Sequence, residues 1–182
     1  MFGFYLWNLP LSGKVFCTLF LVGIGCGCLA AFTQAATAVG VSPAAVEASL
    51  TPDMPMMGMH HGQMSAEKEI TLGDVSNAAK VWIRTPLLIQ TSHTHLFGQT
   101  LIAGLLGLIF LFASLREGTK ALIVALPFVG VLMDIGGMWL TRFVWPPLSV
   151  LVIVGGGLFA LGYVLVTFIS LWQLWLTKEA RA

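Results

Sequence analysis

Two histidines, His93 and His95, stand within a long and otherwise apolar stretch of the sequence. Ionisable side chains are costly to bury in a lipid bilayer, so those found within membrane segments usually mark a functional site. A neutral imidazole can ligate a metal ion or a haem iron, and it can also carry a proton near neutral pH. This pair is therefore the first candidate for a site.

The helix expected to carry these histidines starts near Pro86, which suits a first helical turn with Thr85 as its cap. Residues two apart point to nearly opposite faces of an α-helix, so an unbroken helix cannot direct both rings at one ion. His95 shares its face with Ser92 and Gln99. That polar face suits a site inside a helical bundle.

His93 lies on the other face of the same helix, together with three small residues, Thr100, Gly104 and Gly107. Small residues let helices approach each other closely in membranes. We therefore expect His93 to face a packing surface or a neighbouring subunit, while His95 faces the internal site.

Asp134 is the only carboxylate expected inside the bilayer. It precedes Arg142 by eight residues, which places it about 12 Å from the end of its helix and at a depth similar to that of the histidines. A carboxylate beside an imidazole orients the ring and raises its basicity. We expect Asp134 to pair with His95 or with Arg142, either as part of a site or as a structural link between two helices. The predicted cofactor-binding residues are His93, His95, Gln99 and Asp134.

A second group of potential ligands lies in the segment before this helix, at Met54, Met56, Met57, Met59, His60, His61 and Met64. Thioether sulfur is a soft ligand that suits Cu(I), and imidazole suits Cu(II), zinc or iron. The segment therefore predicts a site that attracts copper. Methionines are also flexible fillers at interfaces, so a mobile or partner-bound loop is the alternative.

Haem b is the other cofactor that the histidines could hold, since helical membrane bundles bind it through axial histidines. No second membrane segment carries a histidine, so a haem with two histidine ligands would need His60, His61 or a ligand from another subunit. Four glycines of the last segment, Gly155, Gly156, Gly157 and Gly162, could let the macrocycle approach the backbone. Such glycines more often serve helix packing.

The composition defines the class of protein. Of the 182 residues, 57% are apolar and only 9% are charged, whereas about 25% charged residues is usual in soluble domains. The formal charge of +1 and the absence of a long basic run give no reason to expect a nucleic-acid partner. The sequence thus indicates an integral membrane protein in contact with the lipid bilayer.

Four segments reach the length of about 20 apolar residues that crosses a bilayer. They are residues 15–39, 87–115, 121–141 and 148–176, and the short connections between the later ones predict an all-α, up-down four-helix bundle. We expect residues 1–182 to form a single membrane domain, with residues 1–14 along the interface. The first apolar run is longer than the core of a secretory signal, so we expect it to be retained as a helix.

The remaining segment, residues 40–86, forms a long loop with a flexible first half (40–64) and a short amphipathic helix at 74–83, whose apolar residues recur at helical spacing. Lysines and arginines near residue 14, at 116–120 and at the C-terminus favour cytoplasmic termini and an extracytoplasmic loop. The predicted location is the inner (cytoplasmic) membrane of a bacterium, with several passes.

No motif of an independent enzyme is present, so we do not expect the chain to be an enzyme on its own. The favoured hypothesis is a subunit of a larger redox or metal-dependent membrane complex, which contributes an extracytoplasmic His/Asp site for copper or haem. One alternative is a non-catalytic accessory subunit that stabilises a complex of other membrane subunits. Another is periplasmic copper handling through the Met/His loop.

Overall fold

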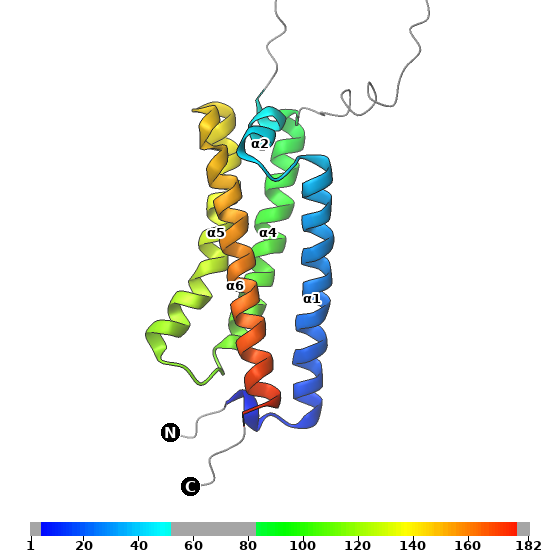
Figure 1. The fold of residues 1–182 in the computed structure, drawn as a ribbon, viewed down its shortest axis with the longest axis vertical. Coiled ribbons are helices and arrows are strands. Elements are labelled where there is room, and N and C mark those ends of the chain that lie inside the picture. The colour runs from blue at the N-terminus through cyan, green and yellow to red at the C-terminus, as the bar shows by residue number, and fades with distance from the viewer. Residues whose placement is uncertain (1–4, 52–82, 178–182) are drawn as a thin grey trace, which may run out of the picture.

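The computed structural model describes residues 5–51 and 83–177, and these residues form helices and no strands. Four long apolar helices, each long enough to cross a membrane, run up and down in alternation (Figure 1). They are α1 (Leu11–Ala38), α4 (Thr85–Phe110), α5 (Glu117–Phe143) and α6 (Val150–Trp175). The predicted all-α membrane bundle with four spans is therefore confirmed.

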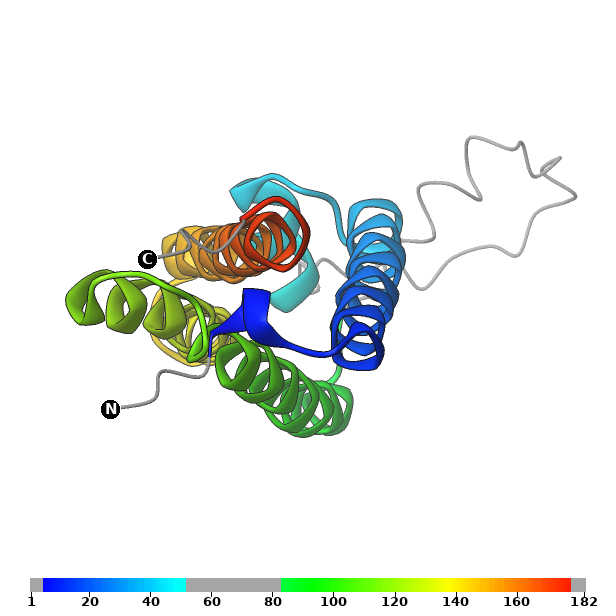
Figure 2. The same ribbon diagram turned by 90° about the horizontal axis from the view of Figure 1, so that it is seen from below.

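Three shorter elements close the two ends of the bundle. The 3-10 turn η1 (Leu6–Asn8) lies across the end at which α1 begins (Figure 2), where the Leu6 amide donates to the carbonyl of Phe112 over 3.1 Å. At the other end lie α2 (Pro43–Leu50) and the 3-10 turn η2 (Pro146–Ser149), which pack against each other.

Helix α2 lies in the part of the loop that was expected to be flexible, residues 40–64. Gly40 makes the turn that precedes it with a φ of 95°, which favours glycine. Ser42 then caps the helix by accepting a 3.2 Å hydrogen bond from the Ala45 amide. Val46 and Leu50 are buried in a cluster with Leu88 of α4, against which side chains of α5 and α6 pack, so tertiary packing holds this short helix. The amphipathic helix expected at 74–83 lies, except for its last residue, outside the described residues.

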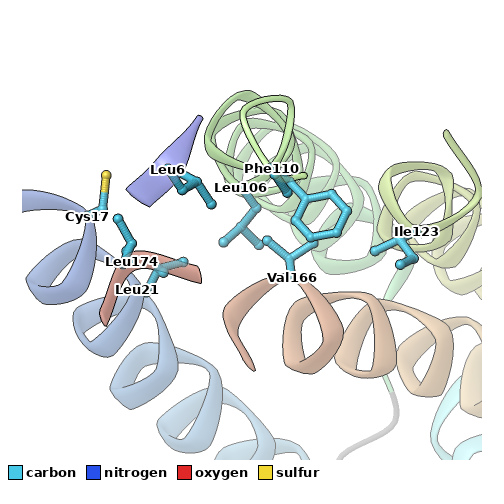
Figure 3. Packing of buried hydrophobic residues seen from close by; sticks show 9 residues of the cluster. Leu6, Cys17, Leu21, Leu106, Phe110, Ile123, Val166 and Leu174 are labelled. Atoms are coloured by element: carbon cyan, nitrogen blue, oxygen red, sulfur yellow. The ribbon is translucent and has the colours of Figure 1, made fainter. Parts of the chain in front are cut away.

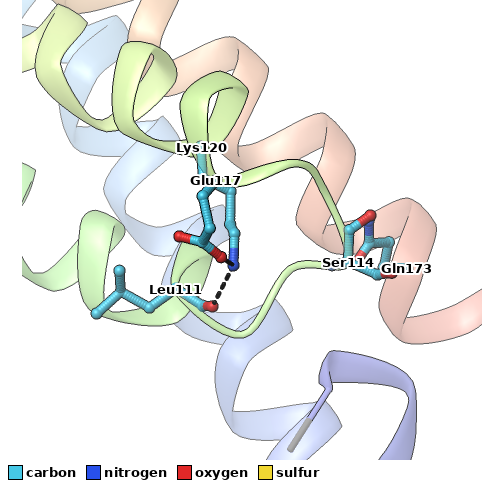
Figure 4. A network of polar contacts seen from close by, with 5 residues as sticks. All are labelled: Leu111, Ser114, Glu117, Lys120 and Gln173. Carbon is cyan, nitrogen blue, oxygen red and sulfur yellow. Dashed lines mark hydrogen bonds and ion pairs between the residues drawn. The ribbon is translucent and has the colours of Figure 1, made fainter. Parts of the chain in front are cut away.

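The span expected at 87–115 is shorter in the structure, because α4 ends at Phe110 and the chain then turns into α5. Figure 4 shows the contacts that hold this turn. Gln173 of α6 accepts a 2.7 Å hydrogen bond from the Ser114 amide, and Lys120 donates to the carbonyl of Leu111 over 3.3 Å. Lys120 also pairs with Glu117 at 2.6 Å, so residues expected in the connection form the first turn of α5.

The apolar core at the η1 end joins side chains from η1, α1, α4, α5 and α6 (Figure 3). Its buried residues are Leu6, Cys17, Leu21, Leu106, Phe110, Ala113, Ile123, Val166 and Leu174. Because η1 contributes a fully buried leucine, residues 6–8 are part of the packed structure.

Helices α5 and α6 make the most extensive contact in the described chain, through glycines that let their backbones touch. A methyl group on Gly130 would lie 2.6 Å from the Phe159 amide nitrogen, and one on Gly137 would lie 2.8 Å from that of Val152. Gly155 meets the backbone of Asp134 in the same way. Gly155 and Gly162 are thus packing residues, whereas Gly156 and Gly157 have nothing within 4 Å.

Helix α1 is the least buried of the four spans, and hydrogen bonds tie it to α6. The Tyr163 hydroxyl donates to the carbonyl of Leu21 over 2.7 Å, and the Trp175 indole donates to the Thr18 hydroxyl over 3.0 Å. Such bonds matter more where apolar packing is sparse, because lipid tails give no hydrophobic reason for two helices to associate.

Replacing Tyr163 with phenylalanine is therefore expected to destabilise the bundle by about 0.6 to 1.7 kcal/mol, the range for polar contacts between membrane helices. The measurement is the free energy of unfolding in mixed micelles titrated with a denaturing detergent. Phe168→Leu, on the exposed face of the same helix, serves as the control and should change little. Equal effects of the two variants would show that the bond to Leu21 does not hold α1.

Candidate functional site

Polar side chains join α4 to α5 at three levels, which together we call the polar seam. On α4 the seam residues are Thr85, Ser92 and Gln99, which recur every seven residues and so share one face. On α5 their partners are Arg142, Trp139 and Asp134. The seam extends from the end of the bundle nearest α2 towards the middle of the two helices.

Arg142 forms the level nearest α2. One guanidinium nitrogen donates to the carbonyls of Leu50 and Ile83, each over 2.9 Å, and the other donates to the Thr85 hydroxyl over 3.0 Å. Thr85 is the first helical residue of α4 and Arg84 occupies the cap position, so the expected capping role of Thr85 is wrong. The arginine instead joins the end of α2, the start of α4 and the end of α5.

The middle and deepest levels lie within the spans. The Trp139 indole donates to the buried Ser92 hydroxyl over 2.8 Å. Asp134 is buried where α5 meets α6, and its carboxyl hydrogen-bonds the side chain of Gln99. The Gln99 carbonyl oxygen is itself buried and has no hydrogen-bond partner in the described part of the chain.

Gln99 thus takes the place that the sequence assigned to His95 or Arg142 as the partner of Asp134. Among residues 5–51 and 83–177, Asp134 has no ion pair. Arg142 lies two helical turns further along α5, where it binds the carbonyls of the α2 region. The seam therefore brings together Gln99 and Asp134 of the predicted site, and leaves both histidines aside.

Both histidines are exposed on α4, which runs unbroken from Thr85 to Phe110. The rings do not converge on one point, as expected for residues two apart in a continuous helix. The His93 ring lies against that of Phe97, with centroids 4.9 Å apart. His93 is exposed, so the packing surface or neighbouring subunit expected there stays a prediction. The expectation that His95 faces an internal site is not met, because its side chain is exposed, at the edge of the face that carries Ser92 and Gln99.

The structure assembles no metal site from the residues it describes: no three side chains among His, Cys, Asp and Glu come together there. The predicted copper ligands, Met54, Met56, Met57, Met59, His60, His61 and Met64, lie outside the described residues. A metal or haem held by His93 or His95 would therefore need further ligands from that segment or from another chain.

The roles of Thr85, Trp139 and Arg142 in the seam were not predicted from the sequence. A signal was present, because Thr85, Ser92 and Gln99 are spaced by seven residues and all three are polar within an apolar helix. Polar residues at that spacing lie on one face and indicate a partner helix.

These features define an integral membrane protein in which polar contacts link membrane-spanning helices. Residues 84–181, over half of the chain, match the Aq_1264_TM family, which is described as a transmembrane helical domain. The chain belongs to this family. The matched region comprises α4, α5 and α6, and so contains the polar seam and both exposed histidines. Comparisons with curated proteins and with solved structures gave no match.

Proposed function

We propose that the chain is a subunit of a larger redox or metal-dependent membrane complex, and that the histidines of α4 ligate copper or haem where it meets another subunit. The observation that carries this proposal is the exposure of His93 and His95 on a membrane-spanning helix. Lipid offers an imidazole no hydrogen-bond partner, so such a face is stable when protein or a ligand covers it.

The chemistry of the exposed face supports these cofactors. Imidazole is a ligand for copper and for haem iron. Because the two rings point in different directions, each can supply one nitrogen ligand to a separate site. The other ligands of each site would come from outside α4. Asp134 is not needed for this role, since it is hydrogen-bonded to Gln99 within the chain.

We propose in addition that the chain lies in a bacterial inner membrane with both termini in the cytoplasm. The basic residues Lys14, Arg116 and Lys120 lie near the η1 end of the bundle, which supports cytoplasmic termini and an extracytoplasmic α2 end. Both histidines are nearer the α2 end of α4, so the site would lie on the extracytoplasmic side of a bacterial inner membrane.

The test is metal analysis and an optical spectrum of the full chain, purified from its own membrane in mild detergent. We expect copper, or a Soret band from haem, and we expect His93→Ala/His95→Ala to lose at least nine-tenths of it. Thr94→Ala, between the two histidines and also exposed, is the control and should retain the cofactor. A wild-type protein with neither copper nor haem would refute the proposal and favour a non-catalytic accessory subunit.

A second variant distinguishes copper binding by the loop from copper binding by α4. It carries alanine at Met54, Met56, Met57, Met59, His60, His61 and Met64. Loss of copper from this variant, together with retention by His93→Ala/His95→Ala, would favour copper handling by the loop. Loss from the histidine variant alone would support the site on α4.

A further inference from the structure

One face of α4 is exposed along most of the helix and carries Gln90, His93, Phe97, Thr100 and Gly104, which we call the His93 face. These positions follow one another at intervals of three, four, three and four residues. That is the repeat of a seam between two helices that wind around each other. Because every member is exposed, none of the other described elements fills this seam.

We infer that the His93 face binds the same face of a second copy of this chain, so that two α4 helices pack in parallel. The inference names the partner that the proposed function leaves open, and it rests on that function for the role of this face as a subunit contact. The hydrogen-bonding groups of the face, its lack of charge and its depth in the membrane all favour a second copy as the partner.

The polar groups of the His93 face complement themselves. The Gln90 amide and the Thr100 hydroxyl each have a donor and an acceptor, as an imidazole has in its neutral form, so each of the three side chains can bond to its own copy. No lysine, arginine, aspartate or glutamate lies between Thr85 and Phe110. Two copies would therefore meet without repulsion, and nothing on this face calls for a partner of opposite charge.

The depth of the His93 face in the membrane also favours a second copy as the partner. Two copies inserted in the same direction and related by a two-fold axis along the membrane normal place each residue at the level of its own counterpart. His93 then meets His93 of the second copy. One chain offers a single imidazole on this face, and the second copy supplies another. A methyl group on Gly104 would have no atom of the described residues within 4 Å, so this position leaves room for the two backbones to approach.

The test is energy transfer between donor- and acceptor-labelled copies of the full chain in liposomes, measured at increasing dilution with lipid and with a metal chelator present. Gly104→Leu should raise the dissociation constant at least tenfold. Gly98→Leu is the matched control, since Gly98 also has nothing within 4 Å but lies on another side of α4, and it should leave the dissociation constant unchanged. Thr100→Leu is a second variant on the same face and should act as Gly104→Leu does.

Equal transfer in Gly104→Leu, Thr100→Leu and Gly98→Leu would overturn the inference, and so would a wild-type protein that shows no transfer. Copper or haem bound where a single copy of this chain meets a different subunit would also overturn it, while the proposed function would stand. Conversely, a dimer that is lost with Gly104→Leu but holds neither copper nor haem would support the inference and refute the proposed function.

Discussion

Replacing Arg142 with alanine is expected to lower the free energy of unfolding by about 2 to 3 kcal/mol, because three oxygen atoms lose a charged donor at once. These are the carbonyls of Leu50 and Ile83 and the hydroxyl of Thr85. The guanidinium is half-buried, so water would replace part of what is lost. The helices would remain, but the end of α2 would lose its hydrogen bond to α5.

Unfolding of the full chain in mixed micelles measures this loss, and hydrogen exchange at α2 locates it. The control is Glu117→Gln, which removes an ion pair whose carboxylate is 87% exposed and which should contribute about 0.5 kcal/mol or less. Arg142→Lys should recover only part of the stability, since one ammonium group cannot reach three acceptors with the fork of a guanidinium. Equal stability of the alanine and Glu117→Gln variants would contradict this role.

The four spans could be read from the sequence because a bilayer demands long apolar runs, and few other structures contain them. Helix α2 could not be read in this way, since residues 43–50 are too few to show a pattern. The helix depends on burying Val46 and Leu50 in a cluster to which α4, α5 and α6 contribute. The ends of α4 and α5 were misplaced for a related reason. The side chains that fix them, such as Gln173, come from a distant helix.

The candidate site was predicted in part. Helical spacing correctly separated the two histidines and correctly placed Ser92 and Gln99 on a buried face. It could not show that His95 is exposed, because that depends on how the other helices pack around α4. The partner of Asp134 could not be predicted either, since several residues at similar depth could have paired with it. Only the rotation of α4 relative to α5 selects Gln99.

Gly155→Ala is expected to destabilise the protein by about 3 kcal/mol, because the added methyl group would overlap the backbone of Asp134 on α5. Backbone atoms cannot move aside as a flexible side chain can, so α5 and α6 would have to separate. Gly156→Ala is the matched control one residue further along. It meets nothing within 4 Å and should stabilise α6 by about 0.5 to 1 kcal/mol through helix propensity alone.

The double variant Gly130→Ala/Gly155→Ala tests whether separation of the helices is the cause. A methyl group on either glycine would lie 2.7 Å from the carbonyl oxygen of the other, so both substitutions strain the same contact. Once one has pushed the helices apart, the other should add little, and the double variant should lose less than the sum of the single losses. Strict additivity in unfolding measurements would mean that each glycine acts locally, and that α5 and α6 do not meet as closely as described.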